Sequence, residues 1–291
     1  MSKTCGANPG GSDRPSTLEQ RMKARENMDR IPHKILVMSG KGGVGKTSVA
    51  VNLAHAFQTM GLRAGLMDVD IHGPNVPLMC GVEGAQPHVV DGRVEPVLSA
   101  GGVKVVSMSF FLPSAQEAVI WRGPVKIGAI QQFMADVDWS DVDVLVIDCP
   151  PGTGDEPLSV AQLLGPSLDG AIIVTTPQDV SLLDSGRSVT FAKKLEIRVL
   201  GILENMAGFS CPHCGEETDL FGRNGGKRAA RAFEVPYLGH LPISAAMVTA
   251  GDAGTPLVLE APDDPASRML LRIAEGLKVD WEQESEASPL A

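Results

Sequence analysis

The chain has few aromatic residues and a deficit of positive charge. Only 4% of its 291 residues are aromatic, and 25 Lys and Arg residues stand against 35 Asp and Glu residues, which gives a net charge of −10. Nucleic-acid binding depends on basic surfaces that contact phosphates and on aromatic side chains that stack on bases. The composition therefore argues against nucleic acid as the main partner.

Long apolar runs and disulfide frameworks are also missing. No apolar run approaches the about 18 residues of a membrane-spanning helix, and residues 1–30 lack the apolar stretch of a signal peptide. The five cysteines are an odd number, and two of them form a Cys-x-x-Cys pair. This usage favours a metal or redox role in a reducing compartment. We therefore expect a cytoplasmic protein that does not bind a membrane.

From residue 34 onward, short apolar segments alternate with helical patterns. The expected strands are Lys34–Met38, Ala64–Met67, Val103–Ser107, Val144–Ile147, Ala171–Thr175, Val199–Leu203 and Tyr237–Gly239. The expected helices are Ser48–Met60, Lys126–Asp136, Glu156–Leu164, Ser181–Leu195, Arg223–Phe233 and Pro265–Lys278. This alternation predicts an α/β fold, with a mainly parallel sheet and helices on both of its faces. An Asp91-Gly92 turn within His88–Leu98 indicates a β-hairpin.

The composition divides the chain into three parts. Residues 1–32 are rich in Gly, Pro, Ser and charge and are predicted to be a mobile polar arm, with a helical pattern around Leu18–Met28. Residues 33–279 contain no linker-like stretch and are predicted to be a single domain that includes the Cys-x-x-Cys loop near residues 205–218. Residues 280–291 are acidic and are predicted to be a disordered tail.

A phosphate-binding motif follows the first strand. Its residues are Gly40, Lys41, Gly42, Gly43, Val44, Gly45, Lys46, Thr47 and Ser48. They fit the pattern G-x-x-x-x-G-K-[ST] between a strand and a helix, the context that the motif requires. Glycines let the backbone turn tightly around an anion, and the helix N-terminus adds N–H groups. The alternative is a glycine-rich turn that precedes a helix by chance. We expect a bound nucleoside triphosphate, with Lys46 at the β- and γ-phosphates and the Thr47 hydroxyl on Mg²⁺.

Two other strands end in acidic residues. Asp148 follows Val144–Ile147 and is expected to act on Mg²⁺ through water. Asp68 and Asp70 follow the second strand, where alternate positions share one face. We assign Asp70 to the positioning of water and Asp68 to a Mg²⁺–water contact. These two roles are interchangeable on sequence alone. The alternatives are that Asp148 caps a helix or turn and that one of Asp68 and Asp70 only caps the turn after the strand.

Cys211 and Cys214 are separated by two residues, a spacing that lets two thiolates hold one side of a metal centre. Zn²⁺ and iron–sulfur clusters each take about four protein ligands. The simplest completion is a second copy of the chain at a twofold axis. A zinc site within one chain, a redox dithiol and cysteines without function are the alternatives. Cys80 and Cys149 are interpreted as buried fillers.

Taken together, these motifs resemble those of the Mrp/ApbC-type P-loop ATPases. This family belongs to the deviant Walker A group, which also contains the septum-site ATPase and the nitrogenase iron protein. The resemblance covers roughly residues 33–278 and rests on four blocks of sequence. The blocks are the Lys41-bearing loop, Asp68-Val69-Asp70 with Gly73-Pro74, Asp148-Cys149-Pro150-Pro151-Gly152-Thr153-Gly154-Asp155, and Glu204-Asn205-Met206 with Cys211 and Cys214.

The resemblance implies a homodimer that binds ATP with Mg²⁺ and hydrolyses it slowly. It also implies a [4Fe-4S] cluster bridged by the two Cys-x-x-Cys pairs and transferred to apo iron–sulfur proteins. Lys41 is implied to reach the partner's nucleotide, and Asn205 to lie near the adenine. The chain departs from the family at Asn75, where Ser is common. In addition, Cys5 alone matches the N-terminal cluster of eukaryotic relatives, so no second cluster is expected.

Two other functions remain as alternatives. A membrane- or nucleoid-associated positioning ATPase would use a basic amphipathic C-terminal helix, whereas residues 280–291 contain four acidic residues and no Lys or Arg. An ATP-coupled reductase of the nitrogenase type would carry its cysteines singly, whereas this chain pairs them. The sequence therefore favours the cluster carrier.

Overall fold

The computed structural model describes residues 17–70, 73–111, 123–211, 213–214 and 216–287. Its centre is an eight-stranded sheet in the order β12-β9-β8-β1-β7-β2-β6-β5. The strands are β1 (His33–Met38), β2 (Ala64–Asp68), β5 (Val97–Leu98), β6 (Lys104–Ser107), β7 (Val144–Asp148), β8 (Gly170–Thr175), β9 (Val199–Glu204) and β12 (Tyr237–His240). Neighbouring strands are parallel except that β5 pairs antiparallel with β6. The predicted mainly parallel sheet is confirmed.

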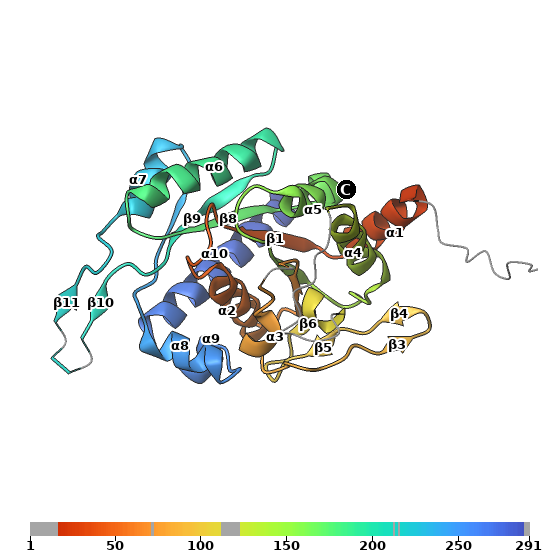
Figure 1. The fold of residues 1–291 in the computed structure, drawn as a ribbon, viewed down its shortest axis with the longest axis horizontal. Helices are drawn as coiled ribbons and strands as arrows, with labels where there is room; N and C mark the ends of the chain where they lie inside the picture. Colours follow the sequence, from red (N-terminus) through yellow and green to blue (C-terminus); the bar gives the residue numbers. More distant parts are fainter. Residues whose placement is uncertain (1–16, 71–72, 112–122, 212, 215, 288–291) are drawn as a thin grey trace, which may run out of the picture.

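Helices cover both faces of this sheet (Figure 1). They are α1 (Thr17–Asp29), α2 (Lys46–Thr59), α3 (Val76–Met79), α4 (Gly123–Asp136), α5 (Asp155–Leu164), α6 (Val180–Lys194), α7 (Gly225–Ala232), α8 (Ala245–Asp252), α9 (Leu257–Glu260) and α10 (Pro265–Ala287). Successive residues of a strand point to opposite faces. Accordingly, Ile35 and Val37 of β1 pack with α2 and α10, while Leu36 and Met38 pack with α1 and α4 to α7.

The N-terminal part of the body begins earlier than the sequence predicted. Helix α1 packs on α4, with Ala24 and Met28 buried in the core. The Asn27 amide donates hydrogen bonds of 2.8 Å to the carbonyls of both Met134 and Val137. Residues 17–32 are therefore packed on the domain and are not a mobile arm. The sequence did not indicate this, because the few anchoring residues lie within a polar segment. The remainder of the predicted arm, residues 1–16, lies outside the described residues.

The C-terminal helix also differs from its prediction. Helix α10 continues to Ala287, past the expected end at Lys278 and into the predicted disordered tail. Trp281 is only 7% exposed. Its ring stacks on His33 with a centroid distance of 4.0 Å and on Phe57 at 5.4 Å. One buried aromatic residue thus anchors an otherwise acidic segment to the start of β1. Residues 288–291 lie outside the described part of the chain.

Two short hairpins extend from the body. The expected one joins β3 (Val89–Val90) and β4 (Arg93–Val94) through Asp91 and Gly92, whose φ angles of 50° and 76° suit a tight hairpin turn. The other joins β10 (Phe209–Ser210) and β11 (Glu217–Thr218) and projects away from the sheet (Figure 1). Within the described ranges, no helix has the length and apolar character needed to cross a membrane.

Candidate functional site

The predicted nucleotide-site residues meet at the carboxyl edge of the central strands. Strand β7 lies between β1 and β2, and Asp148 is in register with Val37 on one side and with Asp68 on the other. The phosphate loop leaves β1 after Met38 at the same edge. Parallel strands place their carboxyl ends together, which is where α/β proteins bind ligands. The topology therefore joins three motifs that are far apart in the sequence.

The loop from Gly40 to Gly45 has the backbone shape that the glycines predict. Gly43 and Gly45 have φ angles of 77° and 81°, and Gly45 is the N-cap of α2. A Cβ added at Gly40 would clash with the backbone of Asp184 in α6, so this position needs glycine for close approach. The N–H groups in the first turn of α2, which starts at Lys46, are left to donate hydrogen bonds to an anion.

Lys46, Thr47 and Asp148 form one buried network. The Lys46 Nζ lies 2.5 Å from Oδ1 of Asp148, and the Thr47 hydroxyl donates to Oδ2 of Asp148 over 2.8 Å. Lys46 is 6% exposed and Asp148 is fully buried. The structure thus brings together the residue predicted at the phosphates and the two predicted at Mg²⁺.

Asp68 and Asp70 lie beside this network. Oδ1 of Asp68 accepts the backbone N–H of Asp70 over 3.0 Å, and Oδ2 accepts the Ser107 hydroxyl over 2.8 Å. Asp68 therefore uses both oxygens within the protein, and Asp70 is 8% exposed. Ser107, at the end of β6, was not identified from the sequence. The signal that could have found it is a hydroxyl that closes an apolar strand, as the aspartates do in β2 and β7.

The network concentrates negative charge. Burial and the nearby Asp148 carboxylate raise the pKa of Asp68 well above its usual range. Burial also raises the pKa of Asp148, an effect that Lys46 and Thr47 only partly oppose. Burial alone would lower the pKa of Lys46, but the charge and hydrogen bond of Asp148 raise it, so the ammonium stays charged. Because burial and neighbouring carboxylates disfavour the charged forms of Asp68 and Asp148, the site favours an added cation.

Lys41 points to α6 of its own chain. Its Nζ donates to the Ser181 hydroxyl over 2.7 Å, and that hydroxyl lies 2.8 Å from Oγ1 of Thr176. Ser181 and Thr176 were missed in the sequence, where a serine and a threonine near a helix start gave no specific signal. The implied reach of Lys41 to a partner chain stays a prediction.

Asn205 lies directly against the phosphate loop. Its Nδ2 donates to the Val44 carbonyl over 2.9 Å, and its Oδ1 accepts the N–H of Met206 over 2.9 Å. A Cβ at Gly45 would clash with this amide. Both polar atoms of Asn205 are therefore engaged within the protein, and the implied position near adenine stays a prediction.

The cysteine pair occupies the end of the β10–β11 hairpin. Cys211 is half-buried and Cys214 is exposed, and the Cys211 N–H donates to the Glu216 carbonyl over 2.9 Å. Hydrogen bonds from the backbone N–H groups of His213 and Cys214 lower the pKa of Cys211. In the part of the chain that the structure describes, no group of three or more His, Cys, Asp or Glu residues is placed to hold a metal ion. The hairpin therefore offers two accessible thiols and too few ligands for a closed site.

The other described cysteines are unsuited to metal binding. Cys80 and Cys149 are both buried. Burial raises the pKa of Cys80 to about 12 and raises the pKa of Cys149 further. Because a metal ligand must be a thiolate, the expectation that these residues fill the core fits their environment.

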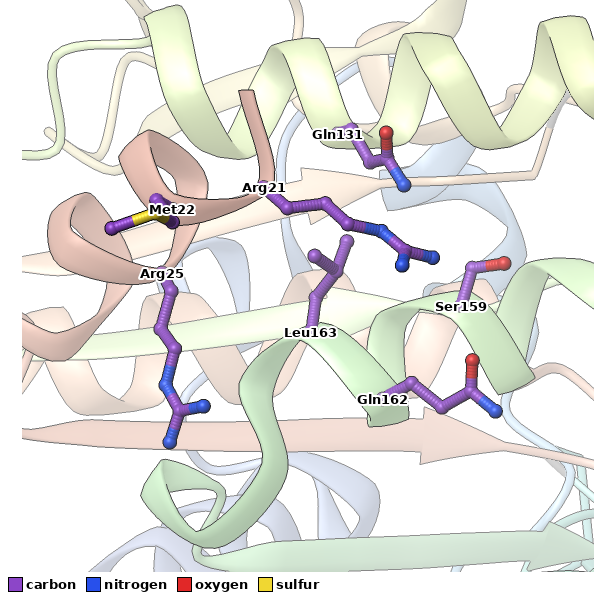
Figure 2. Close-up of a pocket in the computed structure, with 7 residues that line it drawn as sticks. All are labelled: Arg21, Met22, Arg25, Gln131, Ser159, Gln162 and Leu163. Carbon is purple, nitrogen blue, oxygen red and sulfur yellow. The ribbon is translucent and has the colours of Figure 1, made fainter. Parts of the chain in front are cut away.

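A recess of about 250 Å³ lies between α1, α4 and α5, apart from these motifs (Figure 2). Arg21 extends across it toward Gln131 and Ser159, whereas Arg25, which also lines the recess, points away from these two residues. None of the residues predicted for the nucleotide or the metal lines this recess. The phosphate loop needs no deep pocket, because its ligands are backbone N–H groups at a sheet edge.

Comparisons with known proteins agree with this arrangement. The chain is 48% identical over 259 residues to a protein of Methanocaldococcus jannaschii named "Iron-sulfur cluster carrier protein", with 88% of this chain and 89% of that protein covered. A protein of the same name from Methanococcus maripaludis is 46% identical over 256 residues, with 88% of each chain covered.

Solved structures have the same architecture. One is a nucleotide-binding protein from Archaeoglobus fulgidus in complex with ADP, in which cobalt was found. It is 38% identical to this chain with a TM-score of 0.71, and the match covers 80% of this chain and 91% of that one. The cell division ATPase MinD of Pyrococcus furiosus, at 24% identity and a TM-score of 0.62, covers 85% of this chain and 99% of its own and shares the fold. The family model described as "ParA: NUBPL iron-transfer P-loop NTPase" matches residues 30–278, and the chain therefore belongs to this family of P-loop NTPases.

Proposed function

We propose that the protein is an ATP-binding and ATP-hydrolysing carrier that holds an iron–sulfur cluster between two copies of the chain and transfers it to apo iron–sulfur proteins. The observation that carries this proposal is the presence, in one chain, of a formed phosphate loop and of an exposed two-cysteine hairpin. The names of the relatives support the same function. As a cytoplasmic protein it would work in the reducing compartment that free thiols need.

The nucleotide half of this function depends on the carboxyl edge of the sheet. The backbone N–H groups of residues 40–48 and the Lys46 ammonium would hold the phosphates of ATP. Thr47 and Asp148, already 2.8 Å apart, would hold Mg²⁺, which supplies positive charge at the phosphates. Asp70 would orient the attacking water, with Asp68 fixed beside it by Ser107. The buried carboxyl groups of Asp68 and Asp148, whose charged forms are disfavoured by burial, support the binding of a divalent cation.

The cluster is the cargo, and the hairpin suits a cargo that must be released. Cys211 and Cys214 are accessible, and the lowered pKa of Cys211 favours the thiolate that binds iron. A cluster takes about four protein ligands, usually cysteines. Two hairpins from two chains would supply them for a [4Fe-4S] cluster, and exposure of the hairpin would let a recipient exchange its own ligands for these.

A second copy is also supported near the nucleotide. Val180 and Leu183, on the first turn of α6, are 68% and 73% exposed. They flank Ser181, to which Lys41 is bonded. Leu183 and, one turn further along α6, Arg187 line a groove of about 470 Å³. Exposed apolar residues beside a functional lysine are typical of an interaction surface, and we assign this surface to the second copy.

Anaerobic reconstitution with iron and sulfide tests the proposal. We expect about four iron and four sulfide per two chains, in a particle whose mass, measured by light scattering, is that of a dimer. Replacing Cys211 and Cys214 by Ser should remove the cluster while leaving MgADP binding unchanged, and Cys5→Ser serves as the matched control that keeps the cluster. Normal cluster content in the double variant, or a full cluster on a monomer, would refute the proposal.

Transfer needs its own measurement. The loaded protein is mixed with an apo-ferredoxin, and the recipient's absorbance and activity are followed with MgATP, with MgADP and without nucleotide. A carrier should convert the recipient faster than the same amount of free iron and sulfide does. If free iron and sulfide convert the recipient at the same rate, the proposed transfer would be refuted and the protein would only store the cluster.

A further inference from the structure

The side chain of Asn205 spans two segments that the proposed function assigns to different tasks. On one side it donates to the Val44 carbonyl, inside the phosphate loop, over 2.9 Å. On the other it accepts the N–H of Met206, the next residue toward the cysteine hairpin, also over 2.9 Å. Its own backbone N–H is fixed to the Thr175 carbonyl at the end of β8 over 2.7 Å. Asn205 is therefore a rigidly held bridge, only 9% exposed.

The next residue has an unusual backbone conformation. Met206 has a φ of 59°, in the left-handed region that glycine or asparagine ordinarily occupies. Such conformations persist where the surroundings enforce them, and they concentrate at switch regions. Here the enforcing contact is the Asn205 oxygen on the Met206 N–H. Any shift of that side chain therefore changes the restraint on Met206.

The base of the hairpin rests on the segment after β12. The Ala207 N–H donates to the Leu241 carbonyl over 2.9 Å, and the Ile243 N–H donates to the Gly208 carbonyl over 2.8 Å. Beyond this support the hairpin has two register pairs, Phe209 with Thr218 and Ser210 with Glu217. The hairpin is thus short, and its hydrogen-bonded base lies between Met206 and Cys211 in the chain.

The phosphate-loop end of the bridge leaves little room for independent movement. Val44 is 2% exposed. Gly45 lies so close to the Asn205 amide that an added Cβ would clash with it. Because a bound phosphate fixes the backbone of this loop, occupancy of the loop changes the restraint on Asn205.

From these contacts we propose that Asn205 is a positioning residue that couples the phosphate loop to the cysteine hairpin, so that a bound nucleotide orders the segment bearing Cys211 and Cys214. The inference rests on the proposed function for the identity of the two ligands. It adds the route by which one site controls the other. Coupling of this kind follows from a residue whose contacts with both sites differ between two states.

Hydrogen–deuterium exchange of the full-length, metal-free, reduced protein tests the coupling. With saturating MgADP, we expect exchange of the amides of residues 207–218 to slow by about fivefold or more. The β3–β4 hairpin is the internal control, because its strands are as short as those of the β10–β11 hairpin and pair with each other. Equal slowing in both hairpins would mean global stabilisation and would overturn the inference, as would no slowing in residues 207–218.

Two variants locate the route. Asn205→Leu removes both hydrogen bonds at similar volume and should abolish the slowing at saturating MgADP. Met206→Gly keeps both hydrogen bonds of the Asn205 side chain but relieves the left-handed strain, so it should keep MgADP affinity and lose most of the slowing. If Asn205→Leu no longer binds MgADP or does not fold, Met206→Gly decides the question. A wild-type response in Met206→Gly, or in a nucleotide-bound Asn205→Leu, would refute the coupling.

These outcomes are separable from those of the proposed function. The exchange measurement uses protein without iron or sulfide, so a chain that fails to assemble a cluster still reports whether its nucleotide site and hairpin are coupled. Conversely, a chain that carries a cluster normally but shows no exchange response would keep the proposed function and lose the coupling.

Discussion

Replacing Lys46 by Met perturbs the buried cluster of charges at the nucleotide site. The substitution keeps a long side chain but removes the ammonium that lies 2.5 Å from Asp148. Removing one partner of a buried ion pair costs about 3–5 kcal/mol of stability, because the other charge stays buried without compensation. Since Thr47 still donates to Asp148, we expect the lower part of that range, about 3 kcal/mol at neutral pH.

The pH dependence of this loss has a definite sign. Burial raises the pKa of Asp68 and of Asp148 in the folded protein, and the charge of Lys46 opposes both shifts. Loss of Lys46 therefore raises both pKa values further. A carboxyl group with a raised folded-state pKa contributes its stability below its unfolded pKa of about 4 and loses it as the pH rises through the folded value. The destabilisation by Lys46→Met should accordingly grow between pH 5 and pH 8.

The assay is urea denaturation of the metal-free and nucleotide-free protein at pH 5.5 and pH 8, followed by the fluorescence of the buried Trp139 and Trp281. Arg198→Met is the matched control. Arg198 forms a 2.7 Å pair with Glu284 in which both side chains are 58% exposed, and exposed pairs contribute less than about 1 kcal/mol. A Lys46→Met loss no larger than the control, or one independent of pH, would refute this account of the site.

Three further variants test other parts of the structure. Lys41→Ala should keep MgADP affinity while phosphate release falls about tenfold or more, if this lysine stabilises transferred charge; unchanged turnover would remove it from the mechanism. Gly40→Ala should cost about 1–3 kcal/mol in urea denaturation, because its Cβ meets the Asp184 backbone; a neutral result would mean that α6 moves freely. Trp281→Ala should lower the free energy of unfolding by about 3–5 kcal/mol. Wild-type stability in this variant would mean that Trp281 does not anchor residues 280–287.

The fold was largely predictable because its strongest signals are local. The strands β1, β7 and β8 are buried on both faces, so each is an apolar run, and α2 carries apolar residues at helical spacing, among them Val49, Leu53, Ala56 and Phe57. The two-residue strands β10 and β11 are too short to have any period. The end of α10 was misplaced for a related reason, since the composition around Trp281 is that of a disordered tail, whereas the segment is held by tertiary contacts of Trp281 with His33 and Phe57.

The site was predictable where a motif fixes the backbone and not where a contact is purely tertiary. The glycine positions of the loop follow from local geometry, and the aspartates follow from the strands that they end. Ser107 reaches Asp68 from 39 residues away, and Ser181 reaches Lys41 from 140. A hydroxyl carries no charge and fits no spacing motif, so even the position of Ser107 at the end of an apolar strand does not name its partner. The sheet order and the packing of α6 are needed to pair these two residues with Asp68 and Lys41.

The two lysines of the phosphate loop differ in how freely they can move. Lys46 is 6% exposed and ion-paired with the buried Asp148, and breaking such a pair costs about 3–5 kcal/mol. Lys41 is held by the neutral hydroxyl of Ser181, and a hydrogen bond to a charged group contributes about 1.5–3 kcal/mol. Lys41 is therefore the cheaper positive charge to reposition. Under the proposed function, a second copy would dock on the exposed apolar residues beside Ser181, and that docking would supply the free energy that moves the lysine.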